Sequence, residues 1–161
     1  MEQPTIKQLE EKLARAERFQ QITQCLFQIS NAVNQTPDLD ELYASIHKAL
    51  SRVIDTNNFY IARYNDSDDS VTFPYCRDLV DDCYPDVFGV SNTESLTAEV
   101  IRKGQPVFVN KAQMIEKREK SGRKIPSCTP SEVWLGVPLN TTQKTIGVMA
   151  VQCYDDPDRY S

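Results

Sequence analysis

Few side chains in this sequence could support catalysis or metal binding, and they are widely spaced. The chain has one histidine, His47, and five cysteines, Cys25, Cys76, Cys83, Cys128 and Cys153. Zinc sites use paired ligands such as Cys-x-x-Cys, and the cysteines do not have this spacing. His47 lies at the edge of an apolar helical stripe, so we interpret it as a structural or surface residue. We therefore predict no metal site, no nucleophile–base pair and no catalytic residue.

A charged segment at 111–124 is the other feature that could bind a ligand. Six basic residues outnumber two acidic ones, which gives the segment +4 and the rest of the chain −9: Lys111, Lys117, Arg118, Lys120, Arg123 and Lys124 against Glu116 and Glu119. The segment could attract an anionic ligand such as a nucleotide. Alternatively, it is a solvated helix that faces the acidic residues Asp78, Asp81, Asp82 and Asp86. We favour the second interpretation because runs of charge are usually solvent-exposed.

Two apolar runs near the C-terminus, 133–139 and 145–154, flank a polar turn at 140–144. This pattern predicts an antiparallel hairpin within a sheet. Since side chains alternate between the faces of a strand, the residues divide into two sets. One set is aliphatic: Val133, Leu135, Val137, Leu139, Ile146, Val148 and Ala150. The other set leaves space beside a large ring: Trp134, Gly136, Pro138, Gly147, Met149 and Val151.

The second set predicts a small-molecule pocket on one face of the sheet. A strand at 58–64 places Tyr60 and Tyr64 on the same side as Trp134, and ligand pockets combine apolar and aromatic walls with a few polar groups. The candidate ligand-binding residues are Tyr60, Tyr64, Tyr75, Cys128, Glu132, Trp134 and Met149. In the alternative interpretation, a helix at 95–103 and the segment 111–125 fill this face and leave no site.

The N-terminal region predicts a long helix. Thr5 and Gln8 have the spacing of a capping box. Apolar residues then recur at heptad-like steps, with one three-residue slip after Ala16: Ile6, Leu9, Leu13, Ala16, Phe19, Ile22, Leu26, Ile29 and Val33. This stripe is longer than one small domain can cover, so we predict a coiled coil over 1–18 and a parallel homodimer. The part from Phe19 onward is expected to pack on the domain.

Local signals predict the remaining elements. A second helix is expected to start at Thr36-Pro37-Asp38, where a cap residue and a first-turn proline coincide. Strands are expected at 58–65, 70–77 and 105–110. The helix at 95–103 is expected to end at Gly104, two residues before Pro106.

Composition limits the classes of function. The chain has 161 residues and a formal net charge of −5, which argues against a nucleic-acid partner. No apolar run approaches the roughly 20 residues of a membrane span, and no signal-peptide pattern opens the chain. We therefore predict no membrane insertion. Unpaired cysteines without an export signal indicate a cytoplasmic protein.

The segments 58–64, 73–75 and 133–154 resemble the GAF domain, a sensory module of signalling proteins. The resemblance implies an α+β fold: a central antiparallel sheet of five to six strands, with long helices on one face and a ligand-type pocket on the other. It further implies a bacterial signal-transduction protein of the sensor histidine kinase or diguanylate cyclase type. We expect residues 1–18 to form the signalling helix and 19–161 the GAF domain. The final helix of the fold, and the output module after it, are expected to lie beyond Ser161.

Three functional branches of the GAF family have characteristic residues that can be compared with this chain. Cyclic-nucleotide-binding members share only Asn110-Lys111 with this chain, and bilin-binding members need a cysteine beside a histidine. Free methionine sulfoxide reductases use a thiol where this chain has Ser95, and a serine cannot form a sulfenic acid. We therefore predict a ligand-binding sensor without catalytic activity. The alternatives are a dimerisation module with a filled pocket or, less favoured, a reductase-like enzyme; the sequence identifies neither ligand nor cofactor.

Overall fold

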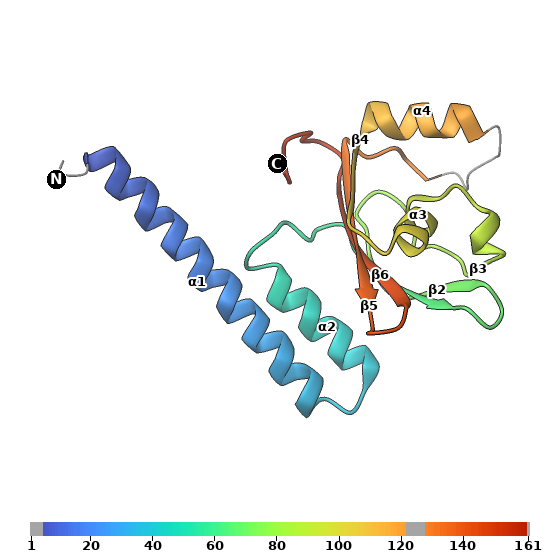
Figure 1. Ribbon diagram of the computed structural model, residues 1–161, viewed down its shortest axis with the longest axis horizontal. Coiled ribbons are helices and arrows are strands. Elements are labelled where there is room, and N and C mark those ends of the chain that lie inside the picture. The colour runs from blue at the N-terminus through green and yellow to red at the C-terminus, as the bar shows by residue number, and fades with distance from the viewer. Residues whose placement is uncertain (1–4, 122–127, 161) are drawn as a thin grey trace. The chain divides into compact units, whose positions relative to one another are not determined.

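A computed structural model describes residues 5–121 and 128–160 and divides the chain into two compact units, Met1–Ile54 and Asp55–Ser161. The first unit is a helical hairpin of α1 (Ile6–Gln35) and α2 (Leu39–Leu50), as Figure 1 shows. Among the described residues, no helix is both long and apolar enough to cross a membrane. The predicted boundary at residues 18 and 19 stays a prediction, because α1 continues through it without a break.

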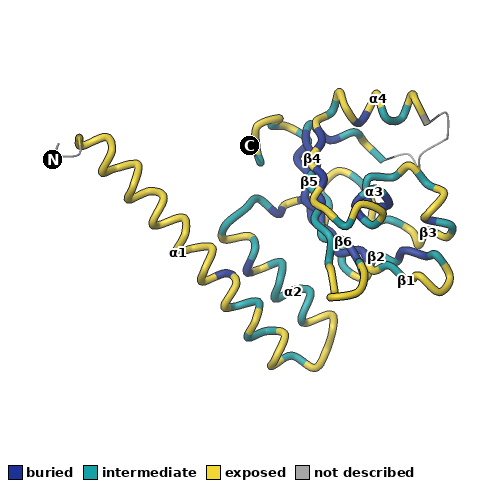
Figure 2. Tube along the Cα trace, viewed as in Figure 1, coloured by how far each residue is buried: buried dark blue, intermediate teal, exposed yellow. Residues whose placement is uncertain are grey.

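The helix ends of the first unit follow the capping signals. Thr5 accepts a hydrogen bond from the Gln8 backbone, while the Gln8 side chain accepts one from the Thr5 backbone, which confirms the capping box. The expected start of the second helix is corrected: Asp38 caps α2 by accepting from the Asp40 backbone, whereas Thr36 is the C-cap of α1 and Pro37 lies before the first turn of α2. Most of α1 is exposed (Figure 2), including the predicted apolar stripe: Ile6, Leu9, Leu13, Phe19, Ile22, Leu26 and Val33 are 41% to 77% exposed.

The second unit is built on one six-stranded antiparallel sheet with strand order β3-β2-β1-β6-β5-β4. Its strands are β1 (Phe59–Asn65), β2 (Ser70–Arg77), β3 (Val87–Phe88), β4 (Val107–Asn110), β5 (Val133–Asn140) and β6 (Thr145–Cys153). This arrangement confirms the predicted fold class. Strand β3 was not predicted, because two residues are too few to show an alternating pattern.

Helices α3 (Leu96–Lys103) and α4 (Lys111–Ser121) and the 3-10 turn η1 (Val90–Asn92) complete this unit. Gly104 ends α3 with a φ of 60°, as the sequence predicted, and Ser95 is its N-cap. Buried residues of α3, α4 and η1 share one core with one face of the sheet: Tyr60, Ala62, Val71, Val90, Ala98, Val100, Val107, Val109, Met114, Trp134, Val148 and Ala150.

The predicted division of β6 between the two sheet faces is wrong. Trp134 pairs with Gln152 and Gly136 with Ala150, so Ala150 and Val148 lie on the Trp134 face, and Met149 lies on the other. The register shifts by one residue next to the turn, between the pair Asn140–Thr145 and the pair Leu139–Gly147. After such a β-bulge, every later side chain of the bulged strand points to the opposite face of the sheet from the one that simple alternation predicts. Without it, the predicted pairing would hold.

Candidate functional site

A cavity of about 200 Å³ lies against the Trp134 face of the sheet, within the second unit. Its walls come from β1, β2, β3, β5 and β6 below, and from α3, α4 and the segments 84–95 and 128–131 around it. The lining side chains are mainly apolar and aromatic, with hydroxyl and cationic groups among them: Tyr60, Val71, Phe73, Tyr84, Pro85, Val87, Val90, Thr93, Glu94, Ser95, Leu96, Thr97, Met114, Lys117, Arg118, Cys128, Thr129, Ser131, Trp134 and Gln152.

Three aromatic rings form one wall of the cavity. The ring centroids of Tyr60, Phe73 and Tyr84 are 5.2 to 5.5 Å apart, with edge-to-face or tilted geometry. Such contacts stabilise aromatic clusters beyond the effect of burial alone. Trp134 supplies a further ring, whose indole occupies the space over Gly136: a Cβ at Gly136 would lie 2.1 Å from its Cη2. Gly136 therefore leaves the space that the indole occupies.

Tyr60 places a neutral polar group at the cavity. Its hydroxyl shares a 2.8 Å hydrogen bond with the Thr97 hydroxyl at the start of α3. Burial raises the pKa of the Tyr60 phenol well above its ordinary value, although the Thr97 hydrogen bond acts in the opposite direction. The phenol is therefore protonated at neutral pH, and it can orient a ligand by hydrogen bonding without adding charge.

Gln152 fixes the loop that carries Tyr84. Its Nε2 lies 2.9 Å from the Tyr84 hydroxyl and 2.8 Å from the Tyr154 hydroxyl, and it also donates to Asp78. On the same loop, the Leu79 backbone donates to the Asn58 side chain over 2.9 Å. These bonds hold segment 78–84 so that Tyr84 faces Tyr60.

The cationic groups of the cavity come from α4. Arg118 donates through Nη2 to the Cys128 carbonyl at 3.2 Å and to the Cys128 sulfur at 3.1 Å. Lys117 forms an ion pair of 2.8 Å with Glu99 of α3, and Lys103 pairs with the same carboxylate. Two helices and the segment after α4 are thereby connected at one end of the cavity.

A comparison with protein-family models matches residues 36–161, which is most of the chain, to the family described as GAF domain. The chain belongs to the GAF domain family. A search of curated proteins gave no match.

Solved structures of signalling and phosphotransferase proteins, two of them GAF domains, have the same fold at low sequence identity. The A. aeolicus Nlh2 GAF domain in an inactive state is 14% identical, with a TM-score of 0.59 over 86% of this chain and 83% of that one. The GAF domain of an Acinetobacter phosphoenolpyruvate-protein phosphotransferase is 15% identical, with a TM-score of 0.63 over 90% and 81%. Residues 122 to 287 of a methyl-accepting chemotaxis protein are 15% identical, with a TM-score of 0.63 over 83% and 84%.

The GAF domain brings three of the seven candidate residues to the cavity: Tyr60, Cys128 and Trp134. Tyr64 instead donates to Asp69 over 3.2 Å, and Glu132 forms a 2.6 Å ion pair with Lys111. Tyr75 and Met149 were expected on the cavity face, but both lie on the opposite face of the sheet. Ile61 pairs with both residues, and the Tyr75 ring contacts Phe59 at 6.0 Å.

Sequence reasoning missed Phe73, Tyr84 and Gln152. Phe73 follows Val71 on the cavity face by simple alternation, and the register shift after it, beside Pro74, turns Tyr75 to the opposite face. Tyr84 comes from a loop without periodicity. Gln152 did carry a signal, because an amide within the apolar run 148–153 needs a hydrogen-bond partner when it is buried.

The basic segment lies along α4, and its ion pairs differ from those expected. In the part of the segment that the structure describes, Lys111 pairs with Glu132, Lys117 with Glu99, and Lys120 with Glu116. Of the acidic residues expected opposite, Asp81 accepts hydrogen bonds from Thr129 and Asp78 from Gln152. Arg123 and Lys124 lie outside the described residues.

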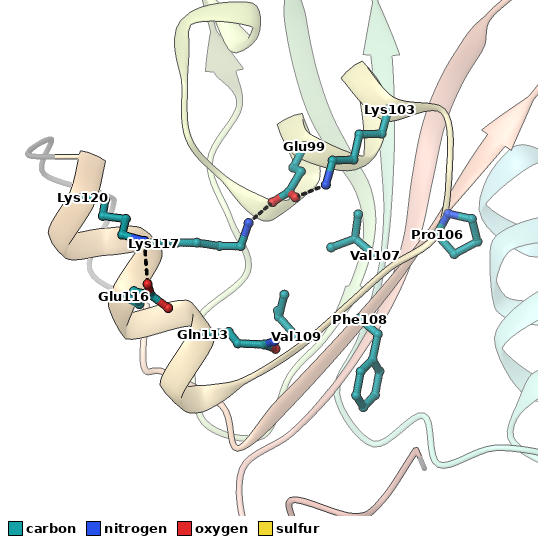
Figure 3. A pocket seen from close by; sticks show the side chains of 10 residues that line it. All are labelled: Glu99, Lys103, Pro106, Val107, Phe108, Val109, Gln113, Glu116, Lys117 and Lys120. Atoms are coloured by element: carbon teal, nitrogen blue, oxygen red, sulfur yellow. Dashed lines mark hydrogen bonds and ion pairs between the residues drawn. The ribbon is translucent and has the colours of Figure 1, made fainter.

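A second hollow, of about 560 Å³, lies between α3, β4 and α4. Figure 3 shows Lys103 and Lys117 reaching Glu99, and Lys120 reaching Glu116. Since these charged groups are paired with one another at the surface, we assign the hollow a structural role.

Asp69 connects the β1–β2 turn to η1, which borders the cavity. Its carboxylate accepts from the Ser91 backbone at 3.1 Å and from the Ser91 hydroxyl at 2.7 Å, and its carbonyl accepts from Val90. Asp69 has a φ of 50°, a left-handed conformation that aspartate and asparagine adopt more readily than most residues.

We expect this connection to weaken in acid. The hydrogen bond from the Ser91 side chain lowers the pKa of Asp69 below 3.8, and burial opposes this shift. A carboxylate with a lower pKa in the folded state stabilises the fold above its ordinary pKa and loses this contribution as the pH falls below it. Asp69→Asn, which keeps the backbone conformation, should therefore flatten the stability–pH curve below about pH 4. Thermal unfolding from pH 7 to 2.5 measures this, with exposed Asp82→Asn as the control; equal curves for the two variants would contradict the assignment.

Proposed function

We propose that this GAF domain is the sensory module of a bacterial signal-transduction protein and binds a small molecule in the Trp134 cavity. One observation carries the proposal: an apolar cavity with four aromatic side chains also contains a small number of fixed polar groups, which is typical of ligand sites. The volume of 200 Å³ exceeds the roughly 150 Å³ that accommodates benzene and lies below the roughly 300 Å³ at which pockets for drug-sized ligands begin. A compact metabolite fits this range better than a nucleotide does.

A matched pair of variants tests ligand binding. Val87→Phe adds a ring to a side chain that lines the cavity, whereas Val80→Phe adds the same ring to a residue that is 51% exposed and outside it. We expect protein purified under native conditions to release a small molecule, detectable by mass spectrometry, that Val80→Phe retains and Val87→Phe lacks. If neither a released molecule nor a library of compounds below about 200 Da distinguishes the two variants, the cavity is filled by its own side chains and the domain is a dimerisation module.

We further propose that α1 transmits the signal as a parallel two-stranded coiled coil. Its exposed apolar stripe supports this, because such a stripe needs a partner helix in water. Charge supports the parallel orientation. When Ile6 and Leu9 are placed at heptad positions a and d, Lys12 falls at position g and Glu17 at position e of the next heptad. In a parallel coiled coil, a g residue of one chain faces this e residue of the other, so the two opposite charges would pair.

The chain itself connects the cavity to this helix. Tyr60 lies on β1, which directly follows α2, and α2 is joined to α1 by three residues. A ligand that moves β1 can bias the helices only by its difference in affinity for two alternative arrangements of the helices.

We propose a cytoplasmic setting, since all five cysteines are free thiols, and an output module of the histidine kinase or diguanylate cyclase type. In this proposal the domain is regulatory, as GAF domains generally are, and not catalytic.

A further inference from the structure

The cavity has two chemically different ends. Phe73 of β2 and Val87 of β3 line it on the side of these two strands, with the ring of Tyr84 against Phe73, whereas α4, which follows β4, supplies Lys117 and Arg118. An occupant therefore meets apolar surface at one end and cationic groups at the other.

The cationic end has a net positive charge within a chain of net charge −5. Lys117 is paired with the Glu99 carboxylate, which Lys103, outside the lining of this cavity, also contacts. Arg118 adds a positive charge beside its hydrogen bonds to Cys128. Glu94, the acidic residue of the lining, has a side chain that is 56% exposed and faces Arg102 at 3.9 Å.

The nearby aspartates do not reverse this balance at the cavity surface. Asp81 accepts from the Thr129 backbone at 2.8 Å and from the Thr129 hydroxyl at 2.7 Å, and Asp78 accepts from Gln152 and Tyr154. Neither aspartate lines the cavity. The phenols of Tyr60 and Tyr84 are neutral, because burial raises the pKa of both.

We propose that the ligand is a compact monocarboxylic acid with an aromatic or branched aliphatic body. Its carboxylate would lie at Arg118 and Lys117, within reach of the hydroxyl groups that line the cavity beside α3, and its body against Phe73 and Tyr84. Guanidinium groups match the planar geometry of a carboxylate, and charge-assisted hydrogen bonds are about twice as strong as neutral ones. This inference rests on the proposed function and specifies the chemistry of the same site.

Two probes of nearly equal shape test the inference: benzoate and its neutral isostere benzamide. Trp134 is the only tryptophan of the chain and lines the cavity, so its fluorescence reports binding directly. We expect wild-type protein to bind benzoate at least about tenfold more tightly than benzamide, the factor expected from one hydrogen bond to a charged group. Arg118→Gln should reduce this preference to less than about threefold, whereas Lys144→Gln, which removes a lysine paired with Asp66 in the hairpin turn, should keep it.

Each result has a defined consequence. Equal or tighter binding of benzamide by wild-type protein would overturn the carboxylate assignment and leave the proposed function intact, because the cavity would still bind a ligand. Absence of binding by both probes up to roughly 10 mM, beyond the millimolar range, would also overturn it, while the released-molecule experiment decides the proposed function separately. A preference for benzoate that Arg118→Gln retains would place the anion site elsewhere. The comparison on wild-type protein needs no variant to fold.

Discussion

Replacing Gly147 with alanine is expected to unfold the second unit or bring it close to unfolding. A Cβ at this position would lie 2.3 Å from the Ala62 carbonyl oxygen, which belongs to the backbone of the neighbouring strand. Real Cβ atoms essentially never approach another heavy atom below 3.0 Å, and a backbone oxygen in a sheet cannot rotate away. Relief of the clash requires β1 and β6 to separate. We expect a loss of at least about 3 kcal/mol in the free energy of unfolding, the upper part of the range for overpacking.

A second glycine provides the matched control. Gly89 has a φ of +68°, and a Cβ there would meet nothing within 4 Å. Gly89→Ala should therefore cost only the strain of a left-handed backbone, roughly 1 kcal/mol. Urea unfolding followed by circular dichroism measures both variants. If both variants lose the same free energy of unfolding, strands β1 and β6 can separate slightly at low cost. The close approach at Gly147 would then not determine the register between these two strands.

Changing two residues of the α1 stripe to glutamate is expected to convert a dimer into a monomer. Leu13 and Leu26 are 60% and 62% exposed, so in a coiled coil they would be buried only by the partner helix. Each substitution would place a charge in the apolar seam, where charges are strongly unfavourable without a partner. We expect the double variant Leu13→Glu/Leu26→Glu to dissociate at least about a hundredfold more readily, because each change should cost more than one 1.4 kcal/mol step.

The matched control is Gln21→Glu/Gln24→Glu, which adds the same charge to α1 outside the stripe. Light scattering at several protein concentrations, with and without residues 1–18, measures assembly. A monomer in the full chain at high micromolar concentration would contradict the coiled coil. Spin labels at Glu11, beside Leu13, measure the relay in the same samples. If the distance distribution is the same in wild-type protein with its ligand bound and in Val87→Phe, the cavity and the helix are not coupled.

The sequence by itself determined the elements with strong local signals. Thr5 and Gly104 mark helix ends because the free N–H and C=O groups of a terminus need partners that only certain residues provide. Strand positions followed from alternation and from β-branched composition. The aromatic face was predictable as far as Tyr60 and Trp134, since each lies on a strand without a bulge between it and the residues that defined its face.

Only the tertiary structure decided which face β6 presents and which loop residues reach the cavity. The bulge beside Thr145 shifts the register by one residue, and this exchange places Val148 and Ala150 where Met149 was expected. Just after the bulge, Gly147 lies against the Ala62 carbonyl, a contact between residues 85 apart in sequence. Tyr84 reaches the cavity because Gln152 fixes its loop through hydrogen bonds. Local patterns do not encode such contacts, because their energies depend on how distant segments pack.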